Sequence, residues 1–77
     1  MAEFQIAIHS YRQVQEFVSL AMKQPFEILV GNDRQNINGK DFMGMFSLDY
    51  TRPLRVRVQC SEKEFLEFRQ QTAKLLA

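Results

Sequence analysis

Three residues near the beginning of the chain have side chains that could handle a phosphate or another anion. His9 and Ser10 precede the first predicted helix, and Arg12 lies in its first turn. A histidine nitrogen can accept a phosphoryl group as a nucleophile, while a helix N-terminus and an arginine attract anions. The structural alternatives are a solvated histidine at a strand end and a Ser10–Gln13 capping box that uses some of the N–H groups. The residues alone leave open an anion site at Ser10 and Arg12, and His9 as a phosphoacceptor.

Other catalytic chemistry has little support in this sequence. The chain has one histidine and one cysteine, with no G-x-S-x-G motif, no phosphate-binding Walker loop and no paired metal-ligand spacing. The single Cys60 excludes an internal disulfide and suits a reducing compartment. Its alternation with Val58 predicts a buried, inert thiol. We therefore expect a protein that is not an enzyme and that has no cofactor and no metal site.

Arginines near the last predicted strand raise the question of nucleic-acid binding. Arg52, Arg55 and Arg57 could form a basic stripe on one face of a sheet. Nucleic-acid binders of this layout stack bases on aromatic side chains of the central strands. The residues predicted to share this face include no aromatic ring: they are Gln5, Ala7, His9, Glu27, Leu29, Arg55, Arg57 and Gln59. We expect a solvated face and no nucleic-acid partner, and RNA binding is the weakest alternative.

Length and composition limit the architecture. The chain has 77 residues, of which 45% are hydrophobic and 25% charged, and its formal net charge is +1. These values are typical of one small globular domain, spanning residues 1–77, with no general attraction to nucleic acid or anionic lipid. The first residues lack the pattern of a signal peptide, and no stretch approaches the apolar length of a membrane span. We therefore expect a cytoplasmic protein without a membrane association.

Hydrophobic periodicity predicts seven elements. In chain order they are a strand at 3–9, a helix from 10 to 24, a strand at 26–30, a weak strand at 35–38, a short helix from 41 to 46, a strand at 54–60 and a helix from 61 to 75 or 76. Side chains predicted to point inward are Phe4, Ile6, Ile8, Val14, Phe17, Val18, Ala21, Phe26, Ile28, Val30, Ile37, Leu54, Val56, Val58, Cys60, Phe65, Phe68, Thr72 and Leu75 or Leu76. Each strand has one apolar face, so helices should cover one side of an antiparallel sheet. The predicted order is β-α-β-β-α-β-α, an open-faced two-layer sandwich.

The short helix lies in a stretch that is unusually apolar for a surface segment. This stretch, NGKDFMGMFSL, spans residues 38–48. Helical spacing puts Phe42, Met43 and Phe46 on one side, and Met45 falls with Leu48 on the other. Because Leu48 leads directly toward the next strand, we expect Met45 and Leu48 to be buried.

The opposite side of this helix is a candidate interaction surface. Phe42, Met43 and Phe46, here called the docking patch, should then be substantially exposed, with Lys40 and Asp41 beside them. Methionine and phenylalanine on a short helix suit an adaptable protein contact. On this reading Phe46→Asp weakens partner binding and costs the fold less than about 1 kcal/mol, as for a surface residue. The alternative is that a small domain buries all of these side chains, and the pattern alone does not decide between the two.

Two motifs resemble HPr, the small histidine-containing phosphocarrier of the bacterial sugar phosphotransferase system. EFVSLA, at 16–21, is similar to the family's E-F-V-x-L-A on its first helix. INGKDFMGMFSL, at 37–48, is similar to the family's V-N-A-K-S-I-M-G-V-M-S-L around its second helix. The positions that match in the second motif are Asn38, Lys40, Met43, Gly44, Ser47 and Leu48. The resemblance runs from about Phe4 to Leu76 and implies the HPr-like fold: an α+β, open-faced two-layer sandwich with a four-stranded antiparallel sheet.

The resemblance also implies where function should lie and where it has changed. In the family, an exposed apolar patch on the second helix docks onto partner proteins, which favours docking at the patch defined above. The family's active loop reads G-L-H-A-R-P, and its histidine accepts phosphate at the start of the first helix. Alignment through EFV places Ser10 at the histidine position, Arg12 at the arginine and Gln13 at the proline, and the loop before them is several residues shorter. Because a phosphoserine is too stable to pass its phosphate on, the resemblance implies an HPr-like protein that lacks the usual phosphoacceptor.

Asp41 occupies a second position that has a known function in the family. Gram-positive members have a serine there that a kinase phosphorylates, and the phosphorylated form binds a catabolite-control repressor. Asp41 supplies a fixed negative charge, smaller than the −1.5 to −2 of a phosphoserine. It is either a mimic of that phosphoserine or only a helix cap.

These observations together predict a regulatory protein that works by docking. The expected partners are enzymes of the phosphotransferase system or a transcriptional regulator. A working phosphocarrier that uses His9 is the alternative, and the exposed apolar side chains also leave a homodimer open.

Overall fold

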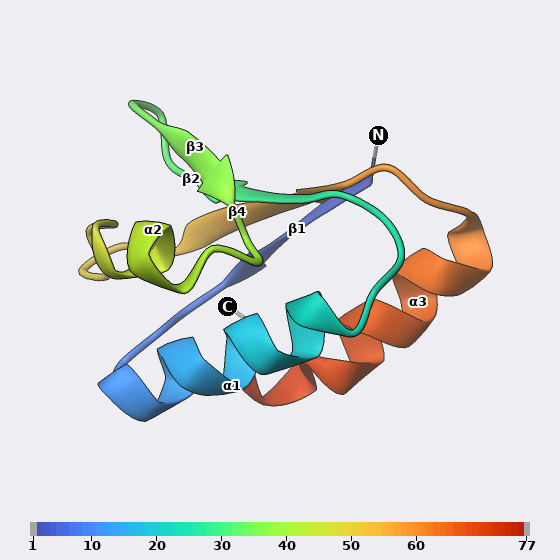
Figure 1. The fold of residues 1–77 in the computed structure, drawn as a ribbon, viewed down its shortest axis with the longest axis horizontal. Coiled ribbons are helices and arrows are strands. Elements are labelled where there is room, and N and C mark those ends of the chain that lie inside the picture. The colour runs from blue at the N-terminus through green and yellow to red at the C-terminus, as the bar shows by residue number, and fades with distance from the viewer. Residues whose placement is uncertain (1, 77) are drawn as a thin grey trace.

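The computed structural model describes residues 2–76 and consists of two layers, a four-stranded sheet and a layer of helices against one of its faces (Figure 1). In chain order the elements are β1 (Ala2–Ile6), α1 (Tyr11–Met22), β2 (Ile28–Gly31), β3 (Asn36–Asn38), α2 (Phe42–Phe46), β4 (Leu54–Val58), α3 (Glu62–Gln71) and the 3₁₀ turn η1 (Ala73–Leu75). The order and the α+β architecture confirm the prediction.

The sheet is antiparallel throughout, with the strand order β1-β4-β2-β3. Strand β4 is therefore central and pairs with β1 on one side and β2 on the other. The register places Val56 opposite both Phe4 and Val30. Because directly paired residues share a face, these three apolar side chains form one row beneath the sheet. The one-sided pattern of the strands is what fixes the side on which the helices pack.

The core lies between this inner face and the helices. The predicted helical stripe of Val14, Phe17, Val18 and Ala21 is buried. Phe68 is at the centre of the aromatic packing, since its ring makes edge contacts with three other rings. The partners are Phe4 at 6.0 Å, Phe17 at 6.0 Å and Phe26 at 5.9 Å between centroids. Such edge-to-face pairs add to the free energy that burial alone provides.

The last helix, α3, begins where the sequence predicted but ends earlier. The Ser61–Glu64 capping box is present at its start, as expected. The helix ends at Gln71, however, and not near Leu75. Thr72 is buried, and its hydroxyl donates to the carbonyls of Phe68 at 3.0 Å and Arg69 at 3.1 Å. The chain then tightens into η1, which still buries Leu75.

The chain after η1 returns to β1. The Ala7 N–H donates to the Leu75 carbonyl at 2.6 Å, and Leu76 forms an isolated bridge with Ile6. The first strand was predicted to extend to His9, but it ends at Ile6. Ile8 is nevertheless buried, as predicted. Within residues 2–76, no helix has the length and apolar character that crossing a membrane requires.

Candidate docking surface

The start of α1 has a capping arrangement that differs from the predicted one. The Ser10 hydroxyl oxygen accepts from the Gln13 N–H at 3.3 Å, as an N-cap should. In a full capping box the Gln13 side chain would accept from Ser10. Here its oxygen accepts from the N–H of His9, one residue earlier, at 2.6 Å. The prediction was therefore wrong in this detail, and the consequence is that Gln13 fixes the backbone of His9.

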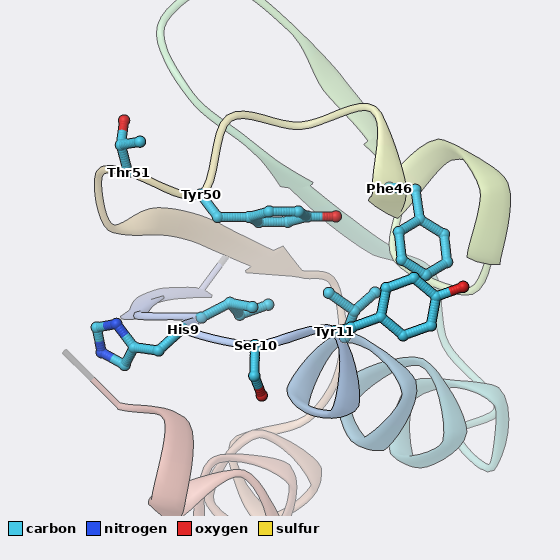
Figure 2. Close-up of a pocket in the computed structure, with 8 residues that line it drawn as sticks. His9, Ser10, Tyr11, Phe46, Tyr50 and Thr51 are labelled. Atoms are coloured by element: carbon cyan, nitrogen blue, oxygen red, sulfur yellow. The ribbon is translucent and has the colours of Figure 1, made fainter.

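The three residues with potential phosphate chemistry lie together but do not form a closed site. His9, Ser10 and Arg12 are all exposed. Figure 2 shows the His9 ring directed away from Tyr11 and Phe46. Over residues 2–76, no hydrogen bond or ion pair joins the His9 ring to Arg12. The structure thus brings these side chains to one end of α1 without holding the histidine against the arginine.

Helix α2 is oriented by its cap and by the side chains that it buries. The Asp41 carboxylate accepts from the Gly44 N–H at 3.2 Å, so Asp41 is the N-cap that the sequence predicted. Met45 is fully buried and Leu48 is 4% exposed. The choice of which side of this helix faces the sheet is confirmed.

The outward side of α2 is the docking patch, and its three members differ in exposure. Met43 is 77% exposed, but Phe42 and Phe46 are only half-buried against the core. The expectation that both rings are substantially exposed was wrong. Both rings pack partly against the core, and the Phe46 ring also stacks on Tyr11 of α1 at 4.3 Å between centroids. Within α2, Phe46 meets the edge of Phe42 at 4.6 Å between centroids.

Tyr11 was not among the predicted site residues. It is the first residue of α1, is 62% exposed, and continues the line of Val14 and Val18 at helical spacing to the exposed start of that helix. A large aromatic ring in phase with such a stripe is a sequence signal, but its contact with α2 depends on the tertiary arrangement. Tyr11 extends the apolar surface from α2 onto the start of α1, next to Ser10 and Arg12.

Lys40, which was predicted to flank the patch, makes a defined contact with the end of α1. It is half-buried, and its Nζ donates to the Gln24 carbonyl at 2.7 Å. Gln24 follows the C-terminal end of α1, and its side chain also donates to Gln71 Oε1 on α3 at 3.0 Å. Lys40 therefore ties the segment before α2 to the end of α1, and its part in docking stays a prediction.

An open pocket of about 520 Å³ lies between the start of α1 and the chain that follows α2 (Figure 2). Its deepest side chains are those of Ile8 and Val14, and the rings of Tyr11, Phe46 and Tyr50 stand around it. The Tyr50 hydroxyl donates to the Met45 carbonyl, which holds this ring in place. Burial raises the pKa of Tyr50 above its ordinary value, as expected for a phenol withdrawn from water.

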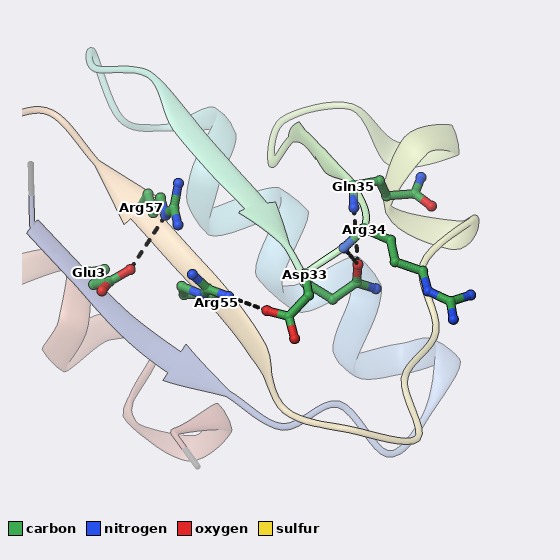
Figure 3. A network of polar contacts seen from close by, with 7 residues as sticks. Glu3, Asp33, Arg34, Gln35, Arg55 and Arg57 are labelled. Carbon is green, nitrogen blue, oxygen red and sulfur yellow. Dashed lines mark hydrogen bonds and ion pairs between the residues drawn. The ribbon is translucent and has the colours of Figure 1, made fainter.

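The outer face of the sheet carries compensated charges (Figure 3). Arg55 pairs with Asp33 at 2.9 Å, and Arg57 pairs with Glu3 at 3.4 Å. Because each of these arginines has an acidic partner, this face is not a free basic stripe. Together with the missing aromatic rings, the pairing argues against the nucleic-acid alternative.

Cys60 differs slightly from the predicted fully buried thiol. It is half-buried two residues beyond the end of β4, where the chain turns toward α3 and the alternation of the strand no longer holds. Burial, and to a smaller extent the nearby charge of Glu64, raise the pKa of Cys60. A raised pKa lowers the thiolate fraction at neutral pH, which is consistent with an unreactive thiol.

No protein-family model matches the chain, and no curated protein matches it either. Among solved structures, the chain is similar to the crystal structure of HPr-C-His from Thermoanaerobacter tengcongensis, with 26% sequence identity and a TM-score of 0.76. The match covers 99% of this chain and 91% of the other. The predicted resemblance is therefore confirmed at the level of the fold.

Proposed function

We propose that this protein, a single HPr-like domain, is a regulatory protein that docks onto partners and does not relay phosphate. The chain has the HPr-like fold, and its likeness to HPr supports a place among phosphocarrier-like proteins that contact other proteins. The proposal goes further, because it assigns to this chain a contact with partner proteins and no transfer of phosphate. The observation that carries it is the continuous apolar surface formed by Met43, Phe46 and Tyr11 across two helices.

The loss of phosphate transfer is argued from the start of α1. By resemblance, the family's histidine position falls on Ser10, which is the N-cap of α1 and uses its oxygen to accept from Gln13. A serine phosphate is an ordinary ester and cannot serve as a high-energy donor. Arg12 and the N-terminal amides of α1 would still attract an acidic group on a partner. Ser10 and Arg12 are thus proposed as an anion-binding edge of the docking surface.

The proposed partners are enzymes of the phosphotransferase system or a transcriptional regulator. Asp41 gives the start of α2 a permanent negative charge, and the Gly44 N–H that it accepts from keeps this carboxylate at the helix end. A regulator that reads a charge at this place would find it without a kinase. The same carboxylate also works simply as a helix cap. Measurements of regulator binding would distinguish a recognised charge from a cap.

A phosphocarrier that uses His9 is the second candidate function. The His9 ring is exposed and next to the N-cap, so a phosphoryl donor could reach it. Its orientation away from Tyr11 and Phe46 counts against a transfer complex at the patch. The transfer would break the donor's phosphorus–heteroatom bond and form a phosphorus–nitrogen bond on the ring.

One experiment separates these functions. The protein is incubated with phosphoenolpyruvate and the first enzyme of the phosphotransferase system, and the intact mass is measured before and after acid treatment. We expect no acid-labile phosphoryl adduct. An adduct that His9→Ala abolishes would overturn the proposal and support the second candidate.

Docking is tested separately by calorimetric titration with the same enzyme and with a catabolite-control repressor. Met43→Asp should weaken binding to whichever of them binds. The matched control is Met22→Asp, because Met22 is 65% exposed at the other end of α1. Equal affinities for the two variants would show that the patch is not the contact surface.

A further inference from the structure

The pocket beside the docking patch has features of a binding site for one side chain. Its size, about 520 Å³, lies within the usual range of about 300–1,000 Å³ for ligand pockets. It opens at the surface, while Ile8 and Val14 at its base belong to the buried core. An occupant would therefore contact the core directly.

The polar groups of the pocket are turned elsewhere or already in use. The Thr51 hydroxyl donates to Asp49 Oδ1 at 2.6 Å, and the Ser10 oxygen accepts from Gln13. The Tyr50 hydroxyl is bound to the Met45 carbonyl, and the His9 ring is directed away from the rings of the pocket. What the pocket offers is aliphatic and aromatic surface.

The charge of the lining decides between kinds of occupant. Within the part of the chain that the structure describes, no lysine, arginine, aspartate or glutamate lines this pocket. A carboxylate or phosphate seated at its base, against Ile8 and Val14, would lose its water without a charged side chain to replace it, which is unfavourable. An uncharged apolar group gains free energy on the same transfer. The pocket therefore favours an apolar side chain over a charged small molecule.

The position of the pocket connects it with the docking patch. Phe46 belongs to both, and Tyr11 joins them through its stack on Phe46. A partner that contacts Phe46 and Tyr11 would therefore lie directly beside the pocket. Interfaces often place one anchor residue in a pocket and surround it with weaker contacts that exclude water.

We propose that this pocket holds one uncharged apolar side chain of a partner protein, of the leucine, methionine or phenylalanine type. This inference rests on the proposed docking function and specifies the residue class with which the partner binds. Full burial of such a side chain corresponds to a gain in affinity of about ten- to a hundredfold.

The first test needs no partner, so its result is independent of docking. The full chain, labelled with nitrogen-15, is titrated with the N-acetyl amides of leucine, methionine and phenylalanine. Expected are shifts of the amide signals of Ile8, Tyr11, Val14, Phe46 and Tyr50, with little response to the N-acetyl amides of aspartate and lysine. No localised shift with the apolar probes overturns the proposal, and so does a stronger response to benzoate than to the phenylalanine probe.

A variant assigns the binding to the pocket. Tyr11→Ala removes one wall at a position that is 62% exposed, so the fold should persist, as circular dichroism can verify. It should reduce the response to the apolar probes, and Met22→Ala on the same helix should not. Equal responses from these two variants overturn the assignment.

The second test uses a partner that binds in the calorimetric titration. Tyr11→Ala should lower its affinity about ten- to a hundredfold, and Met22→Ala should leave it unchanged. If the apolar probes bind in the pocket but Tyr11→Ala keeps full affinity for the partner, the pocket is not the anchor site, although docking through Met43 still stands.

Discussion

The ring of Tyr11 stacks on the ring of Phe46, with 4.3 Å between centroids and 33° between planes. This contact joins the first residue of α1 to the last residue of α2. It explains why Phe46 is less exposed than the helix pattern alone suggests. The candidate surface is therefore formed by two helices, and a substitution at either residue should alter the energetic contribution of the other.

Phe46→Ala should lower the free energy of unfolding by about 1 to 3 kcal/mol, between a surface change and the loss of a core phenylalanine. For Phe46→Asp the sequence had predicted a cost of less than about 1 kcal/mol, because the helix pattern left the ring exposed. Urea denaturation measures the difference. A double-mutant cycle with Tyr11→Ala should give a coupling of about 0.5 to 1.5 kcal/mol. Strict additivity of the two changes would show that the stack contributes nothing.

Truncation of the two methionines of α2 should change the stability of the protein by very different amounts. Met45 is fully buried, so Met45→Ala leaves a cavity and should cost about 2 to 5 kcal/mol. Met43 is 77% exposed, so Met43→Ala should change stability by less than about 0.5 kcal/mol. Thermal or urea unfolding of the two variants checks this. Similar losses at both positions would mean that α2 is rotated relative to its described orientation.

The sequence predicted most of the fold because periodicity reports burial directly. Val14, Phe17 and Val18 follow one helical stripe, and Leu54 and Val56 alternate along a strand, so their inward faces could be assigned before the arrangement was known. The choice to bury Met45 rested on one further argument, the direction of the chain after Leu48, and it is confirmed.

The candidate site was harder to predict because it depends on contacts between elements. Nothing in the spacing of α2 shows that Tyr11 will cover Phe46, or that the Lys40 amine will reach the carbonyl of Gln24. Gln13 has the right type for a capping box, but its side chain reaches one residue beyond the expected amide, to His9. Local patterns predict which residues are near a surface, and only the tertiary arrangement says what they contact.

Alkaline pH should destabilise the protein through Tyr50. Burial raises the pKa of Tyr50 in the folded state above its ordinary value of 10.0, so the unfolded chain loses this proton first. The stabilisation is complete below the ordinary value and is lost as pH rises through the higher folded pKa. Unfolding free energies measured between about pH 8 and 11 should fall at the upper end.

The control for this pH effect is Tyr50→Phe. This variant cannot ionise and should show a smaller decline over the same range, although it starts from a lower stability because it loses the hydrogen bond to the Met45 carbonyl. Parallel declines in the two proteins would assign the alkaline effect to other groups.

Cys60 should react slowly with iodoacetamide. Burial raises its pKa, and the charge of Glu64 adds to the effect, so the thiolate fraction at pH 8 is below that of a free cysteine. The rate of alkylation, followed by mass spectrometry and compared with a short unstructured peptide, checks this. Glu64→Gln keeps an oxygen for the Ser61 N–H and removes the charge, so it should speed the reaction modestly. A rate at or above that of the peptide would contradict the prediction.

The bridge between Leu76 and Ile6 has a practical consequence for attaching the protein to a surface or a tag. It pairs Leu76 with Ile6, two residues before Ile8 of the pocket, whereas Ala2 lies at the opposite end of β1. Four steps along a strand separate Ala2 from Ile6, or about 14 Å. A group attached beside Leu76 would therefore start closer to Ile8 than one attached beside Ala2, which makes the Ala2 side of β1 the better place for a tag when binding at the pocket is measured.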